Sequence, residues 1–134
     1  MFLNKFMNLI KNWDNKTWLS SVKYIKSFNR FLINYGKITQ TSKIIDIGCG
    51  RGKILGNLFS QLKLETKPFG LDIKNHKDKD KRINFKNIDA LTFFIKNNKT
   101  FDLILIKQTI HLLKIINIRK LLILCKKKLN PKGK

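Results

Sequence analysis

The stretch of residues 43–52 restricts the possible folds of this chain most strongly. Residues 43–47 predict a buried strand, and glycines follow directly at positions 48, 50 and 52. Glycines are required where a backbone must turn sharply and approach a ligand without a Cβ in the way. Residues 51–64 then have helical spacing, so the start of this helix offers free N–H groups and a positive dipole end. The pattern predicts a strand, a ligand-binding turn and a helix.

Strands and helices alternate along the rest of the chain. The spacing predicts helices over 14–35, 51–64 and 90–97 and a last one through Ile118, Leu121, Leu122 and Cys125, with strands at 43–47, 68–73, 83–88 and 101–106. Strands that are apolar on both faces are typical of a parallel sheet covered by helices. We therefore expect an α/β fold, a three-layer sandwich with a mainly parallel sheet. At 134 residues it divides into an N-terminal helical segment, 1–38, and one domain, 39–134.

Composition narrows the functional classes. The net charge is +21, yet only four of the 29 basic residues are arginines, the side chain that suits base and phosphate recognition best. We interpret the charge mainly as a solvated surface, with RNA binding as the alternative. Cys49 and Cys125 lack the paired spacing of a zinc site. No apolar run reaches the roughly 20 residues that span a bilayer, and no signal peptide is recognisable, so we expect a cytoplasmic protein.

Two familiar glycine motifs do not fit the turn. The dinucleotide-binding fingerprint places its third glycine three residues after the second, whereas position 53 here is lysine. The turn also lacks the Gly-Lys-Ser/Thr ending of a P-loop. Nicotinamide and nucleoside triphosphate binding of those two types are therefore disfavoured.

Asp-x-Gly-x-Gly-x-Gly at residues 46–52 is similar to the first motif of class I S-adenosylmethionine-dependent methyltransferases. The resemblance continues in chain order through 69–73, 87–90, 101–113 and 129–133, and it covers roughly residues 40–134. It implies a Rossmann-like fold that binds S-adenosylmethionine. The sequence ends where that family has its fifth strand, so we expect a fragment or a short form, with the later strands missing and the edge of the fourth strand exposed.

The resemblance also implies a set of cofactor-binding residues. Asp72 would accept hydrogen bonds from both ribose hydroxyls, and Asp89 with the next backbone N–H would hold the adenine. The complete set is Asp46, Gly48, Cys49, Gly50, Gly52, Asp72, Ile73, Asp89, Ala90 and Lys107. Methyl transfer from a sulfonium leaves a neutral thioether, so no metal ion is implied.

The distribution of acidic residues supports this interpretation separately. The chain has only eight, and Asp46, Asp72 and Asp89 fall at the ends of successive predicted strands. At one edge of the sheet they would give a cationic ligand a negative surrounding in a basic protein. The alternative is that each carboxylate only caps the helix or turn that follows it.

The resemblance predicts a methyltransferase with an unidentified acceptor, and the residues after the fourth strand favour a small molecule. An RNA methyltransferase and a non-catalytic, methyltransferase-like binding module are the alternatives. His111 is a candidate general base because imidazole titrates near neutral pH, although it could also simply pack or cap that loop. Methylation of a nucleobase amine is disfavoured, because Lys107 replaces the Asn or Asp of that motif and no Pro-Pro-aromatic sequence follows.

Overall fold

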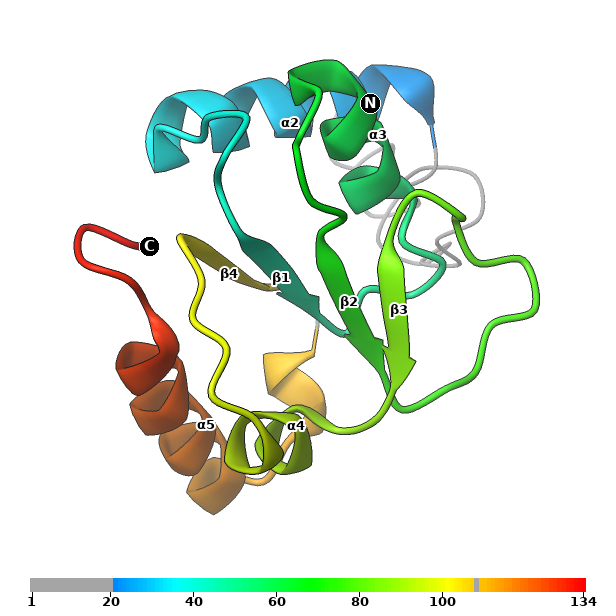
Figure 1. Ribbon diagram of the computed structural model, residues 1–134. Helices are drawn as coiled ribbons and strands as arrows, with labels where there is room; N and C mark the ends of the chain where they lie inside the picture. The colour runs from blue at the N-terminus through cyan, green and yellow to red at the C-terminus, as the bar shows by residue number, and fades with distance from the viewer. Residues whose placement is uncertain (1–20, 108) are drawn as a thin grey trace, which may run out of the picture.

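The computed structural model describes residues 21–107 and 109–134. They form a four-stranded sheet in which every pair of neighbouring strands is parallel, in the order β3-β2-β1-β4 (Figure 1). The strands are β1 (Ile44–Ile47), β2 (Phe69–Asp72), β3 (Asn84–Asn87) and β4 (Leu103–Ile106). The parallel α/β fold predicted from the sequence is confirmed.

Helices cover both faces of the sheet (Figure 1). They are α2 (Val22–Gly36), α3 (Lys53–Leu62), α4 (Ala90–Lys96) and α5 (Ile115–Lys128), with a short 3-10 helix η1 (Ile110–Leu112) after β4. Contacts pair α2 with α3 and α4 with α5. None of these helices is long and apolar enough to cross a membrane.

Two apolar cores lie on opposite faces of the sheet. Ile44, Leu103 and Leu105 pack with Leu55 and Leu58 of α3, while Ile45, Ile47 and Leu71 pack with α4 and α5. Alternate strand residues point to opposite faces, so Asp46 shares the α3 face with Ile44. The whole of β1 is buried because it has a strand on either side and helices above and below.

One local expectation was wrong. β3 is not apolar on both faces: it is a partly exposed edge strand whose residues include two asparagines and Lys86. Gly36 is the last residue of α2, and Lys37 after it adopts the left-handed conformation, at φ 48°. On α5, Leu122 is 48% exposed, whereas its neighbour Leu121 is 1% exposed. Residues 14–20 of the first predicted helix, and residues 1–20 of the predicted N-terminal segment, lie outside the described residues.

β4 is an edge strand of the described sheet, as expected. Lys134 begins to pair with it: its backbone N–H donates to the Asp102 carbonyl at 3.0 Å, and its carbonyl accepts from the Ile104 N–H at 2.8 Å. A parallel bridge also joins Phe101 to Leu129. The backbone at Lys134 thus runs parallel to β4 on the side away from β1.

Candidate functional site

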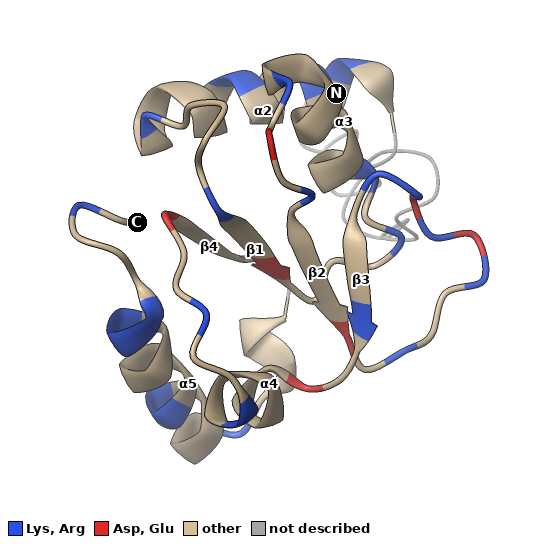
Figure 2. Ribbon diagram, in the orientation of Figure 1, with Lys and Arg blue, Asp and Glu red and all other residues tan. Residues whose placement is uncertain are grey.

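The order of the strands predicts a ligand crevice at the carboxyl ends of β1 and β4. The chain leaves β1 through α3 to β2 on one side, and it reaches β4 on the other side through α4, on the opposite face. Ligands of open α/β sheets bind outside the carboxyl ends of the strands at such a point of divergence. Figure 2 shows acidic residues at the carboxyl ends of β1 and β2 and just before α4, while basic residues are spread over all the helices and loops.

The glycine turn after β1 follows the predicted backbone. Gly48, Gly50 and Gly52 have φ angles of 74°, 57° and 76°, the region that glycine adopts without strain. A Cβ on Gly48 would lie 1.8 Å from Thr109 Oγ1, and one on Gly52 would lie 2.2 Å from Ile83 Cδ1. A Cβ on Gly50 would meet no atom of the described residues within 4 Å. Packing therefore requires glycine at 48 and 52, whereas no described residue covers Gly50.

Asp72, the last residue of β2, supports this turn. Its Oδ2 accepts from the Gly50 N–H at 2.8 Å, and its Oδ1 accepts from the Lys74 N–H at 2.9 Å. His76 Nε2 lies 3.5 Å from the same Oδ2. A carboxylate has about four acceptor positions, so Asp72 can still accept hydrogen bonds from a ligand hydroxyl. Its bond to Gly50 was not part of the sequence-based prediction.

Asp46 of β1 and Lys107, just after β4, form an ion pair at the carboxyl ends of these two strands. Lys107 Nζ donates to Asp46 Oδ2 at 2.7 Å, and the Asp46 side chain is 1% exposed. The other carboxylate oxygen, Oδ1, is buried and has no hydrogen-bond partner among the described residues. Burial raises the pKa of Asp46, Lys107 opposes this shift, and the charge of Asp72 adds to it. A buried carboxylate oxygen without a partner is costly, and a ligand N–H would satisfy it.

Cys49 lies close enough to Asp46, Asp72 and Lys107 for their charges to affect the pKa of its thiol. Burial raises the pKa of its thiol to about 12, with further increases from Asp46 and Asp72 and a decrease from Lys107. Its Sγ donates to the Gly50 carbonyl at 3.4 Å. The structure therefore brings the glycine turn, Asp46, Asp72 and Lys107 into one neighbourhood.

Asp89 has a different local role. It is the N-cap of α4, and its Oδ1 accepts from the Thr92 N–H at 2.9 Å, a bond that lowers the pKa of Asp89. Asp89 thus caps the helix that follows it, and Ala90 is the first residue of α4. Asp89 follows β3 at the same edge of the sheet, but no hydrogen bond or ion pair between described residues joins it to Asp46 or Asp72.

Two predicted residues are exposed. Ile73, just after β2, is 79% exposed. His111 is exposed on η1, and no hydrogen bond or ion pair joins its side chain to another described residue.

Sequence analysis assigned no role to three residues that shape this edge. Thr109 covers Gly48, and its Oγ1 lies 3.1 Å from the Ile47 and Lys107 carbonyls. Asn87 Nδ2 donates to the Asp72 and Ile73 carbonyls at 3.0 and 2.9 Å. Asp80 is buried, accepts from the Arg82 guanidinium at 3.0 and 2.8 Å, and lies against Gly56 of α3. The contacts of Thr109 with Ile47, of Asn87 with Asp72 and of Asp80 with Gly56 each join segments that are separate in the sequence pattern.

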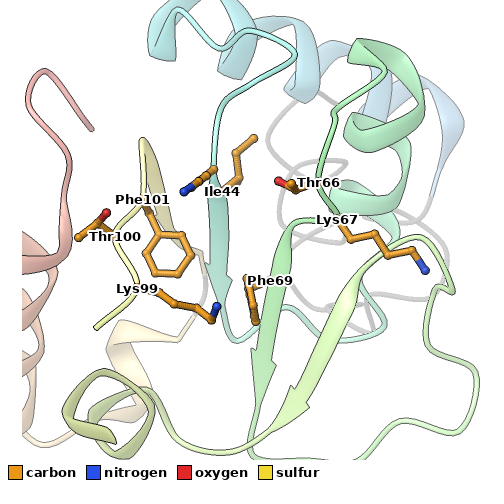
Figure 3. A pocket seen from close by; sticks show the side chains of 8 residues that line it. Ile44, Thr66, Lys67, Phe69, Lys99, Thr100 and Phe101 are labelled. Carbon is orange, nitrogen blue, oxygen red and sulfur yellow. The ribbon is translucent and has the colours of Figure 1, made fainter. Parts of the chain in front are cut away.

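A cavity of about 270 Å³ lies at the opposite edge, by the amino ends of β1, β2 and β4 (Figure 3). Its lining includes Lys43, Lys67 and Lys99 around Phe69 and Phe101. Lys67 Nζ donates to the Lys81 carbonyl, and Lys99 Nζ lies 5.4 Å from the centre of the Phe69 ring. None of the predicted site residues lines it.

Comparison with known proteins gives matches among solved structures. No protein-family model and no curated protein sequence matches the chain. The plantazolicin methyltransferase BpumL, in complex with a pentazolic desmethylPZN analog and SAH, is 27% identical, with a TM-score of 0.66 over 92% of this chain and 49% of that one. A SAM-dependent methyltransferase from Archaeoglobus fulgidus is 25% identical, with a TM-score of 0.63 over 79% and 48%. CalO1, a methyltransferase of calicheamicin biosynthesis in its SAH-bound form, is 16% identical with a TM-score of 0.55 and shows the fold alone.

The described part of the chain therefore has part of the Rossmann-like fold of S-adenosylmethionine-dependent methyltransferases. The four parallel strands in the order β3-β2-β1-β4 match about half of such a domain. The chain spans about half the length of the solved structures BpumL and the Archaeoglobus enzyme.

Proposed function

We propose that this chain binds S-adenosylmethionine at the carboxyl edge of the sheet and takes part in methyl transfer to a small-molecule acceptor. The observation that carries the proposal is the combination of a Gly50 that no described residue covers with a buried Asp46 oxygen that has no hydrogen-bond partner among the described residues. The backbone can approach a nucleoside at Gly50, and Asp46 Oδ1 can accept from an ammonium group. The first feature fits the nucleoside of this cofactor, and the second fits its amino-acid end.

In this proposal the other predicted site residues contact different parts of the cofactor. The turn at Gly48, Cys49, Gly50 and Gly52 would follow the ligand, and Asp72 would accept from ribose hydroxyls while it braces Gly50. Ile73, Asp89 and Ala90 would lie along the adenine, with Lys107 beside the amino-acid end. When bound, S-adenosylmethionine supplies an electrophilic methyl group, so the chain's own task is mainly to align the reactants, which can lower a barrier by roughly 7–11 kcal/mol at best.

His111 is the proposed general base for an acceptor that carries a proton. Its exposed position on η1, just beyond the crevice between β1 and β4, leaves the imidazole accessible. A base is effective only when it reaches the proton that it removes, directly or through one water. Replacement by glutamine would therefore lower the rate of methyl transfer and leave cofactor affinity unchanged.

Calorimetric titration of S-adenosylhomocysteine tests the binding step without any acceptor. We expect saturable binding of one ligand by the wild-type chain and at least tenfold weaker binding by Asp72→Ala. Glu65→Ala is the matched control, since it removes the same charge from an exposed residue away from this edge. Equal affinity of all three proteins, or no binding by the wild type, would contradict the proposal.

A further inference from the structure

Lys107 lies on the side of the ion pair that a second reactant can reach. It follows β4 directly, and β4 pairs with β1 so that Ile106 lies opposite Ile47. Its side chain is 21% exposed, whereas that of Asp46 is 1% exposed. The Asp46 carboxylate is therefore the buried partner of the pair, and the Lys107 ammonium is its more exposed partner.

The ion pair uses only one of the N–H donors of the Lys107 ammonium among the described residues. A lysine ammonium has three N–H donors, and among the described residues only the bond to Asp46 uses one of them. The bond at 2.7 Å also fixes the direction of the side chain. Lys107 is thus a cation held in place, with donors left for an acceptor that carries a negatively charged oxygen.

Charge decides which acceptors suit this position. An alkyl amine is mostly protonated at neutral pH, so it would be repelled by Lys107 and would lack the lone pair that attacks a methyl group. A phenol-type hydroxyl has the opposite property, because a nearby cation favours its deprotonated, nucleophilic form. The net charge of +21 would also draw anions towards the protein.

We propose that the Lys107 ammonium, held at the β1–β4 crevice by Asp46, selects a methyl acceptor with a weakly acidic hydroxyl and stabilises its oxyanion. This inference rests on the proposed function, and it assigns the Lys107 side chain to the acceptor rather than to the cofactor. The acceptor releases its proton to His111, the proposed base, directly or through one water, and its oxygen then forms the new bond to the methyl carbon while the electron pair of the broken carbon–sulfur bond stays on sulfur.

The size of the effect follows from the opposing charges. Lys107 lowers the pKa of a neighbouring hydroxyl, and the ionised Asp46 behind it cancels part of that shift. Asp72, beyond Asp46, adds a smaller opposing contribution. We expect a net decrease in the pKa of the bound hydroxyl of about one unit, which is a tenfold change in its ionisation constant.

The test uses 4-nitrophenol as the probe, because its phenolate absorbs visible light and its ionisation can be followed without turnover. The wild-type chain is first saturated with S-adenosylhomocysteine, and 4-nitrophenol is then titrated with base in about 0.15 M salt, which screens surface lysines. We expect the pKa of the bound probe to fall by about one unit in the wild type and in Lys107→Arg. The shift should disappear in Lys107→Met.

Two further variants separate the possible reasons for a loss. Lys107→Gln removes the positive charge but keeps an N–H donor for the buried Asp46 carboxylate, so it should also lose the shift. Lys120→Met removes an exposed lysine of α5 and should keep the shift. The inference is overturned if the cofactor-loaded wild type does not bind the probe, if the pKa of the probe is unchanged, or if Lys107→Met keeps the shift. Failure to bind S-adenosylhomocysteine would instead contradict the proposed function.

Discussion

Replacement of Gly50 and Gly52 by alanine, one at a time, should separate ligand binding from folding. Both glycines have positive φ angles, 57° and 76°, so alanine costs about 1–2 kcal/mol of backbone strain at either position. The new methyl group of Gly50→Ala enters open space. In Gly52→Ala it would lie 2.2 Å from Ile83 Cδ1, and Ile83 belongs to the core on the α3 face.

The two substitutions therefore differ in their expected cost. Overpacking of a core typically adds about 1–3 kcal/mol, so Gly52→Ala should lower the free energy of unfolding by about 3 kcal/mol and Gly50→Ala by about 1 kcal/mol. Gly50→Ala keeps the N–H that donates to Asp72, so the support of the turn is retained. Its methyl group nevertheless occupies the proposed ligand space, and the affinity for S-adenosylhomocysteine should fall at least tenfold, about 1.4 kcal/mol.

Urea unfolding gives the stabilities, and calorimetric titration of the folded proteins gives the affinities. The reasoning is refuted if Gly50→Ala binds S-adenosylhomocysteine as tightly as the wild type, because the space before Gly50 would then not be the ligand's. It is also refuted if Gly50→Ala is as destabilised as Gly52→Ala, because the difference in packing would then have no energetic effect.

Three other predictions concern the fold and its titrating groups. In urea unfolding, Leu121→Ala should lower the free energy of unfolding by about 3 kcal/mol and Leu122→Ala by less than about 1 kcal/mol, because only the Leu121 side chain is buried. Equal losses in the two variants would show that α5 is oriented differently. Hydrogen bonds from the neighbouring Arg82 lower the pKa of Asp80, so the contribution of Asp80 to stability is present above its unfolded-state pKa and is lost as pH falls through its folded-state pKa. Asp80→Asn should therefore lower the free energy of unfolding by about 2 kcal/mol at pH 7 and by progressively less below about pH 4. Unfolding curves measured at a series of pH values test this, and a difference between wild type and variant that does not change with pH would argue against the ion pair. Burial raises the pKa of Cys49 to about 12 and that of Cys125 to about 11. Alkylation at pH 8, followed by mass spectrometry, should therefore be about a thousandfold slower at Cys49 and about a hundredfold slower at Cys125 than for a free thiol, and rapid labelling would contradict this.

The sequence predicts the parallel sheet because its signals are local. The apolar residues of β1 and β4 and the glycines between β1 and α3 each determine the conformation of a short stretch of chain. β3 was harder to describe, because an edge strand needs less apolar surface and its Asn84 and Lys86 carry no strong strand signal. The conformation of Lys37 was also not predictable from local signals, because a folded structure can hold a lysine in the left-handed conformation that usually favours glycine.

The candidate site was predicted as a set of residues, but not as a set of contacts. Motif spacing identifies Asp46 and Asp72 from their positions near strand ends. Their partners lie far away in the sequence: Lys107 is 61 residues from Asp46, and Gly50 is 22 residues from Asp72. The hydrophobic periodicity of a sequence does not reveal such pairs, because they form only when the strands assemble into the sheet. The cap formed by Asp89 is a local contact. The sequence could not distinguish capping from ligand binding, because both use the same residue type.

The most direct test of the account is a nitrogen-15 NMR titration of the chain with S-adenosylhomocysteine. We predict that the largest shifts of amide signals will come from Cys49, Gly50 and Ala90, around the carboxyl ends of the strands, while Thr66 and Thr100 at the opposite edge stay unchanged. Shifts confined to the amino-end cavity, or no saturable shifts at all, would contradict the claim that the glycine turn and its carboxylates form a nucleoside-binding site.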